Sequence, residues 1–239
     1  MFRFYFMIIS GAVFMLFPIL RAGYMAKHRE RYTQEQCYRA ALRVLRVVRR
    51  FCFAETDCFG EENLPESGGY IMYCNHQGKY DAVGVFLSHK KPATVLMEKK
   101  KMQMFPAKQI VGVIGGKPLD FDDMRQQRRV LDEISEEVRN GRRYLIFPEG
   151  GYADNKNELK DFHAGCFKCA VDSGCPVVPV AIYDSYKALN QNSLKPCRTQ
   201  VHFLEPIMPE AYKEMNRKQL CALVKSRISE KLAEIDSKN

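Results

Sequence analysis

A short apolar run that breaks into Asn-His is the feature that most constrains the fold of this chain. Residues 70–74 are apolar and rich in aromatic side chains, which is typical of a buried strand. Gly78 then allows a sharp turn, and residues 79–89 are predicted to form a helix. His76 is therefore expected at the carboxyl end of a strand, where open α/β sheets bind their ligands.

Asp81 follows His76 by five positions, and this spacing decides whether the two side chains can meet. On one continuous helix they would point about 140° apart, so they can meet only if the chain turns between them. A carboxylate that accepts the Nδ1 proton of a histidine fixes its tautomer and leaves Nε2 free as a base. The alternative is a structural histidine with an unrelated surface aspartate.

Strands and helices alternate through the rest of the chain, after a loop that contains Pro65 and Gly68-Gly69. Strands are predicted at 70–74, 93–97, 143–147, 177–183 and 199–204, and helices at 79–89, 122–140, 162–173 and 216–236. This alternation predicts an α/β fold with a mostly parallel central sheet that is flanked by helices on both faces.

The N-terminus carries a long apolar segment. Residues 4–20 contain no charge, and as a helix they would span about 25 Å, slightly less than the roughly 30 Å hydrocarbon core of a bilayer. A tight span, a re-entrant anchor and a signal peptide all fit. Membrane anchoring is favoured because only Arg3 precedes the segment and no convincing cleavage site follows it.

Basic residues follow the apolar segment at once, at Arg21, Lys27, Arg29 and Arg31. By the positive-inside rule they keep the rest of the chain on the cytoplasmic face of the membrane. The net charge of +9 favours anionic partners, and an anionic membrane surface is one of them. Nucleic acid is not expected among them, because no helix-turn-helix, RNP or zinc-finger pattern is present.

Residues 33–53 are predicted to form a basic amphipathic helix that opens with a capping box of Thr33 and Gln36. Its basic face consists of Arg39, Arg43, Arg46 and Arg50, and its apolar face of Ala41, Val44, Leu45, Val48, Phe51 and Cys52. Beside an apolar anchor, such a helix is expected to lie in a membrane interface. The alternative is a helix that packs on the core with a solvated arginine face.

A second polar motif follows the strand predicted at 143–147. It reads Pro148-Glu149-Gly150-Gly151. The glycines let backbone amides approach a ligand and form an anion-binding concavity, although a tight turn explains the same residues. The lysines at 99–101 and Lys117 lie between the two motifs and are either phosphate contacts or a solvated charged face.

One further group of residues could form a metal site: His163, Cys166, Cys169 and Cys175. Along a helix the first three would cover only part of one face, and cysteine is a common small core residue. Packing is therefore the preferred interpretation, and no metal is expected.

Together the motifs resemble those of the glycerolipid acyltransferases, in particular the 1-acyl-sn-glycerol-3-phosphate acyltransferases. The matching segments are Asn75-His76 with Asp81 (the NHx4D motif), Gly115 to Asp120 (the second motif), Phe147 to Gly150 (FPEG) and Val177 to Val180 (the VPV strand). Their order and spacing agree over about residues 70–205. The resemblance divides the chain into membrane-anchoring helices at 1–55, embedded in one leaflet, and an acyltransferase domain at 56–239.

The resemblance implies acyl transfer to the sn-2 hydroxyl of lysophosphatidic acid (1-acylglycerol-3-phosphate), which gives phosphatidic acid. Acyl-CoA or acyl-carrier protein would be the donor, with no other cofactor. His76 would be the general base and Asp81 would orient it. The substrate-binding residues expected are Asn75, Lys79, Lys100, Lys117, Phe147, Pro148, Glu149, Gly150, Gly151 and Pro179. The alternatives are another lysolipid acceptor and a non-catalytic lipid-binding protein of the same fold.

Two positions depart from the family pattern. Phe121 and Tyr152 stand where the family has arginines that are generally taken to hold the phosphate of the acceptor. Lys100, Lys117 and Lys79 are the predicted replacements, with a point charge in place of a bidentate fork. An acceptor with a different head group is the alternative.

Overall fold

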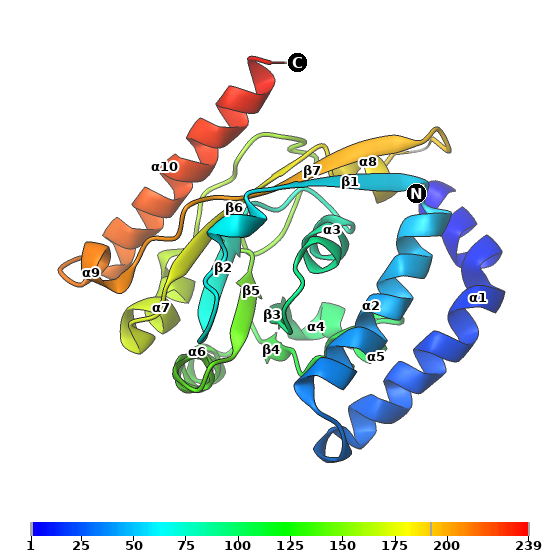
Figure 1. Cartoon of the computed structure of the whole chain (residues 1–239), viewed down its shortest axis with the longest axis horizontal. Helices are drawn as coiled ribbons and strands as arrows, with labels where there is room; N and C mark the ends of the chain where they lie inside the picture. The colour runs from blue at the N-terminus through cyan, green and yellow to red at the C-terminus, as the bar shows by residue number, and fades with distance from the viewer. Residues whose placement is uncertain (1, 192, 239) are drawn as a thin grey trace.

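A seven-stranded sheet forms the centre of the computed structural model, which describes residues 2–191 and 193–238 (Figure 1). The strands are β1 (Ala54–Phe59), β2 (Tyr70–Cys74), β3 (Thr94–Glu98), β4 (Lys117–Leu119), β5 (Arg143–Ile146), β6 (Val177–Tyr183) and β7 (Cys197–Phe203). Their order across the sheet is β1-β7-β6-β2-β5-β3-β4. All neighbours are parallel except β6 and β7, which are antiparallel. The predicted α/β fold with a mostly parallel sheet is therefore confirmed.

Helices cover both faces of this sheet. They are α1 (Phe2–Lys27), α2 (Gln34–Phe51), α3 (Asp81–Ser88), α4 (Lys99–Met102), α5 (Ala107–Val113), α6 (Met124–Arg139), α7 (Lys168–Ser173), α8 (Tyr186–Leu189), α9 (Pro209–Tyr212) and α10 (Arg217–Asp236). One hydrophobic cluster joins α1, α2, α3 and α5 to the sheet, and a second joins α6, α7 and α10 to its opposite face (Figure 1). Alternate residues of β2 enter the two clusters, which explains its continuous apolar run.

The predicted strands lie within about two residues of the observed ones, but two strands were missed. β1 is a half-exposed edge strand with polar residues, and β4 has only three residues, so neither carries an apolar run. The helix predicted at 162–173 was partly wrong. Only α7 is α-helical there, after a 3₁₀ segment at Ala164–Phe167. The apolar helix runs past the predicted 4–20 to Lys27.

The two N-terminal helices form a hairpin that packs on the sheet through α3 and α5. Gly11 of α1 lies against Phe51 of α2, where an added Cβ would come within 3.3 Å of the ring. The Tyr38 hydroxyl of α2 donates to the carbonyl oxygens of Phe86 and His89 at the end of α3. The predicted capping box of Thr33 and Gln36 is present.

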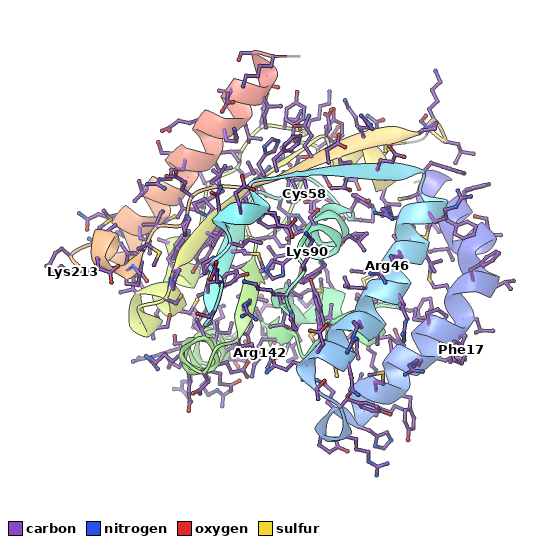
Figure 2. All side chains as sticks on the ribbon, viewed as in Figure 1. Phe17, Arg46, Cys58, Lys90, Arg142 and Lys213 are labelled. Carbon is purple, nitrogen blue, oxygen red and sulfur yellow. The ribbon has the colours of Figure 1, made fainter. Side chains whose placement is uncertain are left out.

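The outward face of α1 is apolar and exposed. Its exposed large side chains are Tyr5, Ile9, Val13, Phe14, Leu16, Phe17, Leu20 and Tyr24. Figure 2 shows Phe17 directed away from the rest of the molecule. Residues 4–27 form a helix long and apolar enough to cross a membrane, by length and composition. Among the described residues, this is the one helix with that property. The chain thus has an N-terminal helix suited to membrane association.

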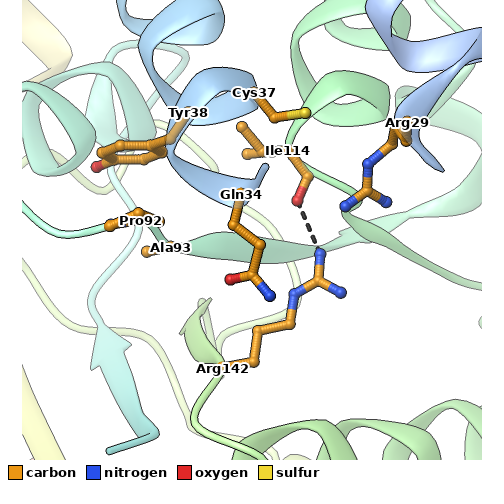
Figure 3. Close-up of a pocket in the computed structure, with 8 residues that line it drawn as sticks. All are labelled: Arg29, Gln34, Cys37, Tyr38, Pro92, Ala93, Ile114 and Arg142. Carbon is orange, nitrogen blue, oxygen red and sulfur yellow. Dashed lines mark hydrogen bonds between the residues drawn. The ribbon is translucent and has the colours of Figure 1, made fainter. Parts of the chain in front are cut away.

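A small hollow lies at the amino ends of β3 and β5, under α2 (Figure 3). Arg142 donates there to the carbonyl oxygens of Ile114 and Gly115, and it pairs with Glu137 at 2.7 Å. Gly115 has a left-handed φ of 65°, and an added Cβ would clash with the Arg29 guanidinium at 2.0 Å. Residues of the helical hairpin and of the sheet therefore meet around this hollow, at the end of the sheet opposite to His76.

Candidate active site

His76 and Asp81 meet directly after β2. The distance from His76 Nδ1 to Asp81 Oδ2 is 2.6 Å, and the aspartate is fully buried. The same carboxylate oxygen accepts the backbone N–H groups of Gln77 at 2.6 Å and Gly78 at 2.9 Å. Asp81 is the first residue of α3, where a negative charge suits the helix dipole. With Nδ1–H donating to the carboxylate, Nε2 is left as the basic nitrogen.

The predicted turn between the two residues is present. Gly78 is needed there to make room for a neighbouring side chain, not for its backbone conformation. Gly78 does not have a left-handed φ; instead an added Cβ would lie 2.7 Å from the Asn190 side chain. The Asn190 amide donates to the Gln77 carbonyl at 3.2 Å, and its oxygen accepts the Lys79 N–H at 3.4 Å. A side chain from the end of α8 therefore braces the turn, and a Cβ at position 78 would displace it.

Glu149 approaches His76 from the end of β5. Its Oε1 accepts the backbone N–H of His76 at 3.0 Å, and the residue is 3 % exposed. Burial raises the pKa of Glu149 to about 6, against the opposing effects of the hydrogen bond from His76 and the charges of His76 and Lys160. The carboxylate thereby fixes the backbone that carries the imidazole.

Two aromatic rings fix the imidazole itself. The Phe147 ring stacks on it with 4.3 Å between centroids, and Tyr152 meets it edge-on at 4.7 Å. The side chain of His76 keeps 17 % of its surface exposed. The ring is thus held by a carboxylate and two aromatic contacts while part of it still faces solvent.

The Pro148-Glu149-Gly150-Gly151 segment forms a tight turn. The Gly150 amide donates to the Phe147 carbonyl at 3.1 Å, and Gly150 has a left-handed φ of 70°. A Cβ at that position would also come within 3.2 Å of the His163 ring. His163 therefore packs against this turn. In the part of the chain that the structure describes, no group of three or more His, Cys, Asp and Glu side chains could hold a metal ion.

The structure brings part of the predicted substrate-binding set together around His76. Phe147, Glu149, Gly150 and Gly151 lie at the turn described above, and the Pro148 carbonyl accepts the His163 N–H at 2.8 Å. Whether these residues contact substrate stays a prediction.

Of two further predicted residues, Asn75 directly follows β2 and Pro179 lies inside β6. The Asn75 side chain is 1 % exposed and exchanges two hydrogen bonds with the backbone of Ile182, at 3.0 and 2.7 Å. Pro179 is buried within β6 and pairs in register with Tyr73. Both residues join β2 to its neighbour β6. Substrate contact by them stays a prediction.

The three predicted lysines are engaged elsewhere. Lys117 pairs with two carboxylates of α6, Glu133 at 2.8 Å and Glu137 at 2.9 Å. Lys100 pairs with Asp122 at 3.1 Å. The Lys79 ammonium lies 5.4 Å from the centre of the Phe4 ring, beside the start of α1. A phosphate contact by any of the three stays a prediction.

Sequence reasoning did not single out two residues in this region, Tyr152 and Lys101. Tyr152 was noted only as a missing arginine, although its ring touches the imidazole. Lys101 lies 5.8 Å from the centre of that ring and pairs with Glu98 at 3.0 Å. The signal in the sequence was the place of Lys101 just after β3, at the same edge of the sheet. The run of three lysines gave no way to choose among them.

Comparisons with known proteins show which family this chain is similar to. A model of the family described as Acyltransferase matches residues 55–183. The 1-acyl-sn-glycerol-3-phosphate acyltransferase of Escherichia coli (strain K12) is 26 % identical over 184 residues, which cover 76 % of this chain and 74 % of that protein. The protein of the same name from Haemophilus influenzae is 25 % identical over 168 residues, with coverage of 70 % and 69 %.

A solved structure shares the fold over almost the whole chain. It is the crystal structure of the 1-acyl-sn-glycerophosphate (LPA) acyltransferase, PlsC, from Thermotoga maritima. The TM-score is 0.69 at 18 % sequence identity, with 95 % of this chain and 98 % of that chain covered. The likeness therefore includes the N-terminal helical hairpin as well as the sheet.

Proposed function

The chain belongs to the Acyltransferase family, and we propose that it transfers an acyl group to the sn-2 hydroxyl of 1-acylglycerol-3-phosphate, giving phosphatidic acid. The names of its relatives support this acceptor. The single observation that carries the chemistry is the His76–Asp81 hydrogen bond of 2.6 Å at the end of β2. An exposed apolar helix beside the domain suits a substrate that resides in a membrane.

His76 acts as the general base in this proposal. Nε2 removes the proton of the acceptor hydroxyl, and the oxygen attacks the thioester carbonyl of acyl-CoA or acyl-carrier protein. The tetrahedral intermediate then collapses, the C–S bond breaks, and the departing thiolate takes the proton back from Nε2–H. Asp81 stabilises the transient imidazolium through Nδ1. Base catalysis of this kind contributes about 10²- to 10⁴-fold.

The oxyanion requires N–H donors, and most amides near His76 are already used. Gln77 and Gly78 donate to Asp81, and Gly150 donates to Phe147. Within the described residues, the amides of Gly151 and Tyr152 donate to no protein acceptor. We assign these two amides to the oxyanion, since such donors stabilise the charge that develops in the transition state.

Direct transfer, without an acyl-enzyme, fits the surroundings of His76. Cys74 is the thiol closest in sequence, and it is fully buried in β2. Burial, with smaller effects of the Asp81 and Glu149 charges, raises the pKa of this thiol well above its usual value. A buried thiol of raised pKa is a poor nucleophile. Acceptor and donor would therefore meet in one ternary complex.

The test is an acylation assay in detergent micelles with the full chain. Wild-type protein, given 1-acylglycerol-3-phosphate with acyl-CoA or acyl-carrier protein, should form phosphatidic acid, detected by mass. His76→Ala should lose about 10²- to 10⁴-fold in kcat. His28→Ala, at the far end of α1, is the matched control and should keep full activity.

Three outcomes would contradict parts of the proposal. Undiminished activity of His76→Ala would reject His76 as the base. Acylation of another lysolipid by the wild type, with no phosphatidic acid from either donor, would reject the acceptor. Phe121 and Tyr152 at the arginine positions are the observation that favours this second candidate. No product from any lysolipid would favour a lipid-binding protein.

A further inference from the structure

The proposed acceptor carries a phosphomonoester, which requires a cation near His76. In 1-acylglycerol-3-phosphate four covalent bonds separate the sn-2 oxygen from the phosphorus. With the hydroxyl at Nε2, the phosphate must therefore lie next to the imidazole. Phe121 and Tyr152 carry no charge, so another position has to supply it. The inference drawn here rests on the proposed function and names the residue that meets this requirement.

Lys99 and Lys100 on α4, and Lys117 at the start of β4, are paired with carboxylates. Lys99 pairs with Asp120 at 3.0 Å, and Lys100 with Asp122 at 3.1 Å. Lys117 lies between Glu133 and Glu137 on α6. These pairs direct the three ammonium groups toward the segment before α6 or toward α6 itself.

Lys101 points the other way. Its ammonium lies 5.8 Å from the centre of the Tyr152 ring, whose centroid is 4.7 Å from that of His76. It also lies 3.7 Å from where a Cβ of Gly151 would stand. Of the three lysines on α4, Lys101 is the one with a described contact to the residues around His76. Its side chain is half exposed, so it can turn toward a bound ligand.

The surroundings of Lys101 suit an anion. Gly151 has no side chain between the ammonium and the turn, and an added Cβ would fill that space. The Lys160 ammonium donates to the Gly151 carbonyl at 3.0 Å and adds a second positive charge at this turn. Glu98 is the carboxylate now paired with Lys101, at 3.0 Å, with the lysine side chain 50 % exposed. Exposed pairs of this kind are weak and are readily exchanged for a phosphate.

We propose that Lys101 binds the phosphate of the acceptor beside Tyr152, with Lys160, which donates to the Gly151 carbonyl, adding a second positive charge. The ammonium replaces the family's arginine forks with a point charge. The phosphate is thereby held on the side of His76 that Tyr152 borders. This arrangement selects acceptors that carry a terminal phosphate.

The test compares two acceptors, 1-acylglycerol-3-phosphate and a monoacylglycerol that lacks the phosphate. Lys101→Gln should lower kcat/KM for the phosphate acceptor by about 10- to 100-fold, chiefly through KM, and leave the monoacylglycerol rate unchanged. Lys101→Arg should recover most of the loss. Lys90→Gln, on an exposed pair with Glu61 at the other end of α3, is the inert control.

The outcomes separate the two proposals. An unchanged KM of Lys101→Gln for the phosphate acceptor overturns the assignment, as does an equal loss on both acceptors, which would indicate a merely structural role. A KM effect in Lys100→Gln instead would show that the sequence-based choice was right. If the wild type forms no phosphatidic acid, the proposed function fails first and the Lys101 assignment fails with it.

Discussion

One carboxylate oxygen of Asp81 organises the turn that carries the base. It accepts the imidazole Nδ1–H and two backbone amides, while Asp81 Oδ1 is buried without a partner. An asparagine could place its oxygen at the position of Oδ2 and keep all three hydrogen bonds. The charge and the geometry at this residue can therefore be separated by one substitution.

Asp81→Asn should keep the fold at reduced stability, because its NH2 group would be buried without an acceptor at the Oδ1 position, and should lose most of its activity. The imidazolium formed during catalysis would lose its counter-charge, so kcat should fall by about 10²-fold or more with little change in KM. Steady-state kinetics with a thermal unfolding curve check both parts. A variant with wild-type kcat would show that the negative charge of Asp81 is not needed.

Glu149 has a positioning role that is independent of its charge. Glu149→Ala would leave the His76 N–H buried without an acceptor, which should lower the free energy of unfolding by about 1–3 kcal/mol. Glu149→Gln retains an oxygen acceptor and should lose much less. Urea unfolding in micelles measures the difference. Equal losses in the two variants would mean that the hydrogen bond to His76 does not matter.

At the scale of elements, α1 has two apolar faces with different roles. Met7, Met15 and Met25 are buried against the domain, while Ile9, Val13 and Phe17 are 71–81 % exposed. Exposed apolar area on this scale marks an interaction surface, and the length of the helix suits a membrane.

Replacing Ile9, Val13 and Phe17 together by Ser should weaken vesicle binding without unfolding the domain. Each large apolar side chain contributes roughly 1.5–3 kcal/mol when it leaves water. Flotation with vesicles measures binding, and circular dichroism checks the fold. The matched variant Met7→Ser should instead lower stability, since Met7 is 2 % exposed. Unchanged flotation of the triple variant would exclude this face as the contact.

The second helix adds charge beside this surface. The predicted basic face is present, and Arg39, Arg43, Arg46, Arg49 and Arg50 are all exposed. Figure 2 shows Arg46 on the side of α2 that faces the viewer, beside α1. Among these five, only Arg39 has a carboxylate partner in the described residues, Glu35 at 3.6 Å. The face is therefore available to anionic lipid.

Arg43→Gln with Arg46→Gln should reduce binding to anionic vesicles only. Each arginine near an anionic surface contributes about 1 kcal/mol, so the pair should cost roughly 10- to 30-fold in partition coefficient. Binding to zwitterionic vesicles should not change, and added salt should abolish the difference. A loss of the same size on both vesicle types would contradict the electrostatic role.

At the scale of the whole molecule, two buried histidines make stability depend on pH. Burial lowers the pKa of His89 from 6.5 to about 4, against the hydrogen bond to the Lys91 carbonyl. Burial also lowers the pKa of His202 to about 4, with a further effect of the Lys231 charge. These rings bind protons on unfolding. Their contribution is therefore present above pH 6.5 and is lost as the pH falls toward 4.

Glu149 works in the opposite direction, because its folded pKa of about 6 lies above its ordinary 4.5. The folded state binds this proton first, which offsets part of the histidine effect between pH 6 and 4.5. The free energy of unfolding should fall by about 2–3 kcal/mol from pH 7 to pH 5, measured by urea titration. His202→Gln should flatten the slope and Glu149→Gln should steepen it. A free energy of unfolding that does not change with pH in the wild type would contradict these pKa shifts.

The sequence by itself determined five of the seven strands and singled out His76 as the proposed base. An apolar run that ends in Asn-His, and a second that ends in Pro-Glu-Gly, are local patterns, and buried strands need only such short-range chemistry to form. In a parallel sheet their carboxyl ends meet at one edge, so the residues around His76, Asp81 and Glu149 could be expected to lie together. The apolar helix and the arginine face were equally readable, because the first is a long uncharged run and the second recurs at helical spacing.

Only the tertiary structure decided which side chains from distant elements complete this edge. Asn190 braces the turn, Tyr152 touches the imidazole, and Lys101, rather than Lys100, approaches the Tyr152 ring. Asn75, predicted to bind substrate, bonds to the backbone of Ile182 in β6. These contacts depend on how α4, α8 and the loops dock on the sheet, and docking has no periodic signature in the chain. The choice of His76 as the proposed base therefore follows from the sequence, whereas the choice of Lys101 as the proposed phosphate contact follows from the fold.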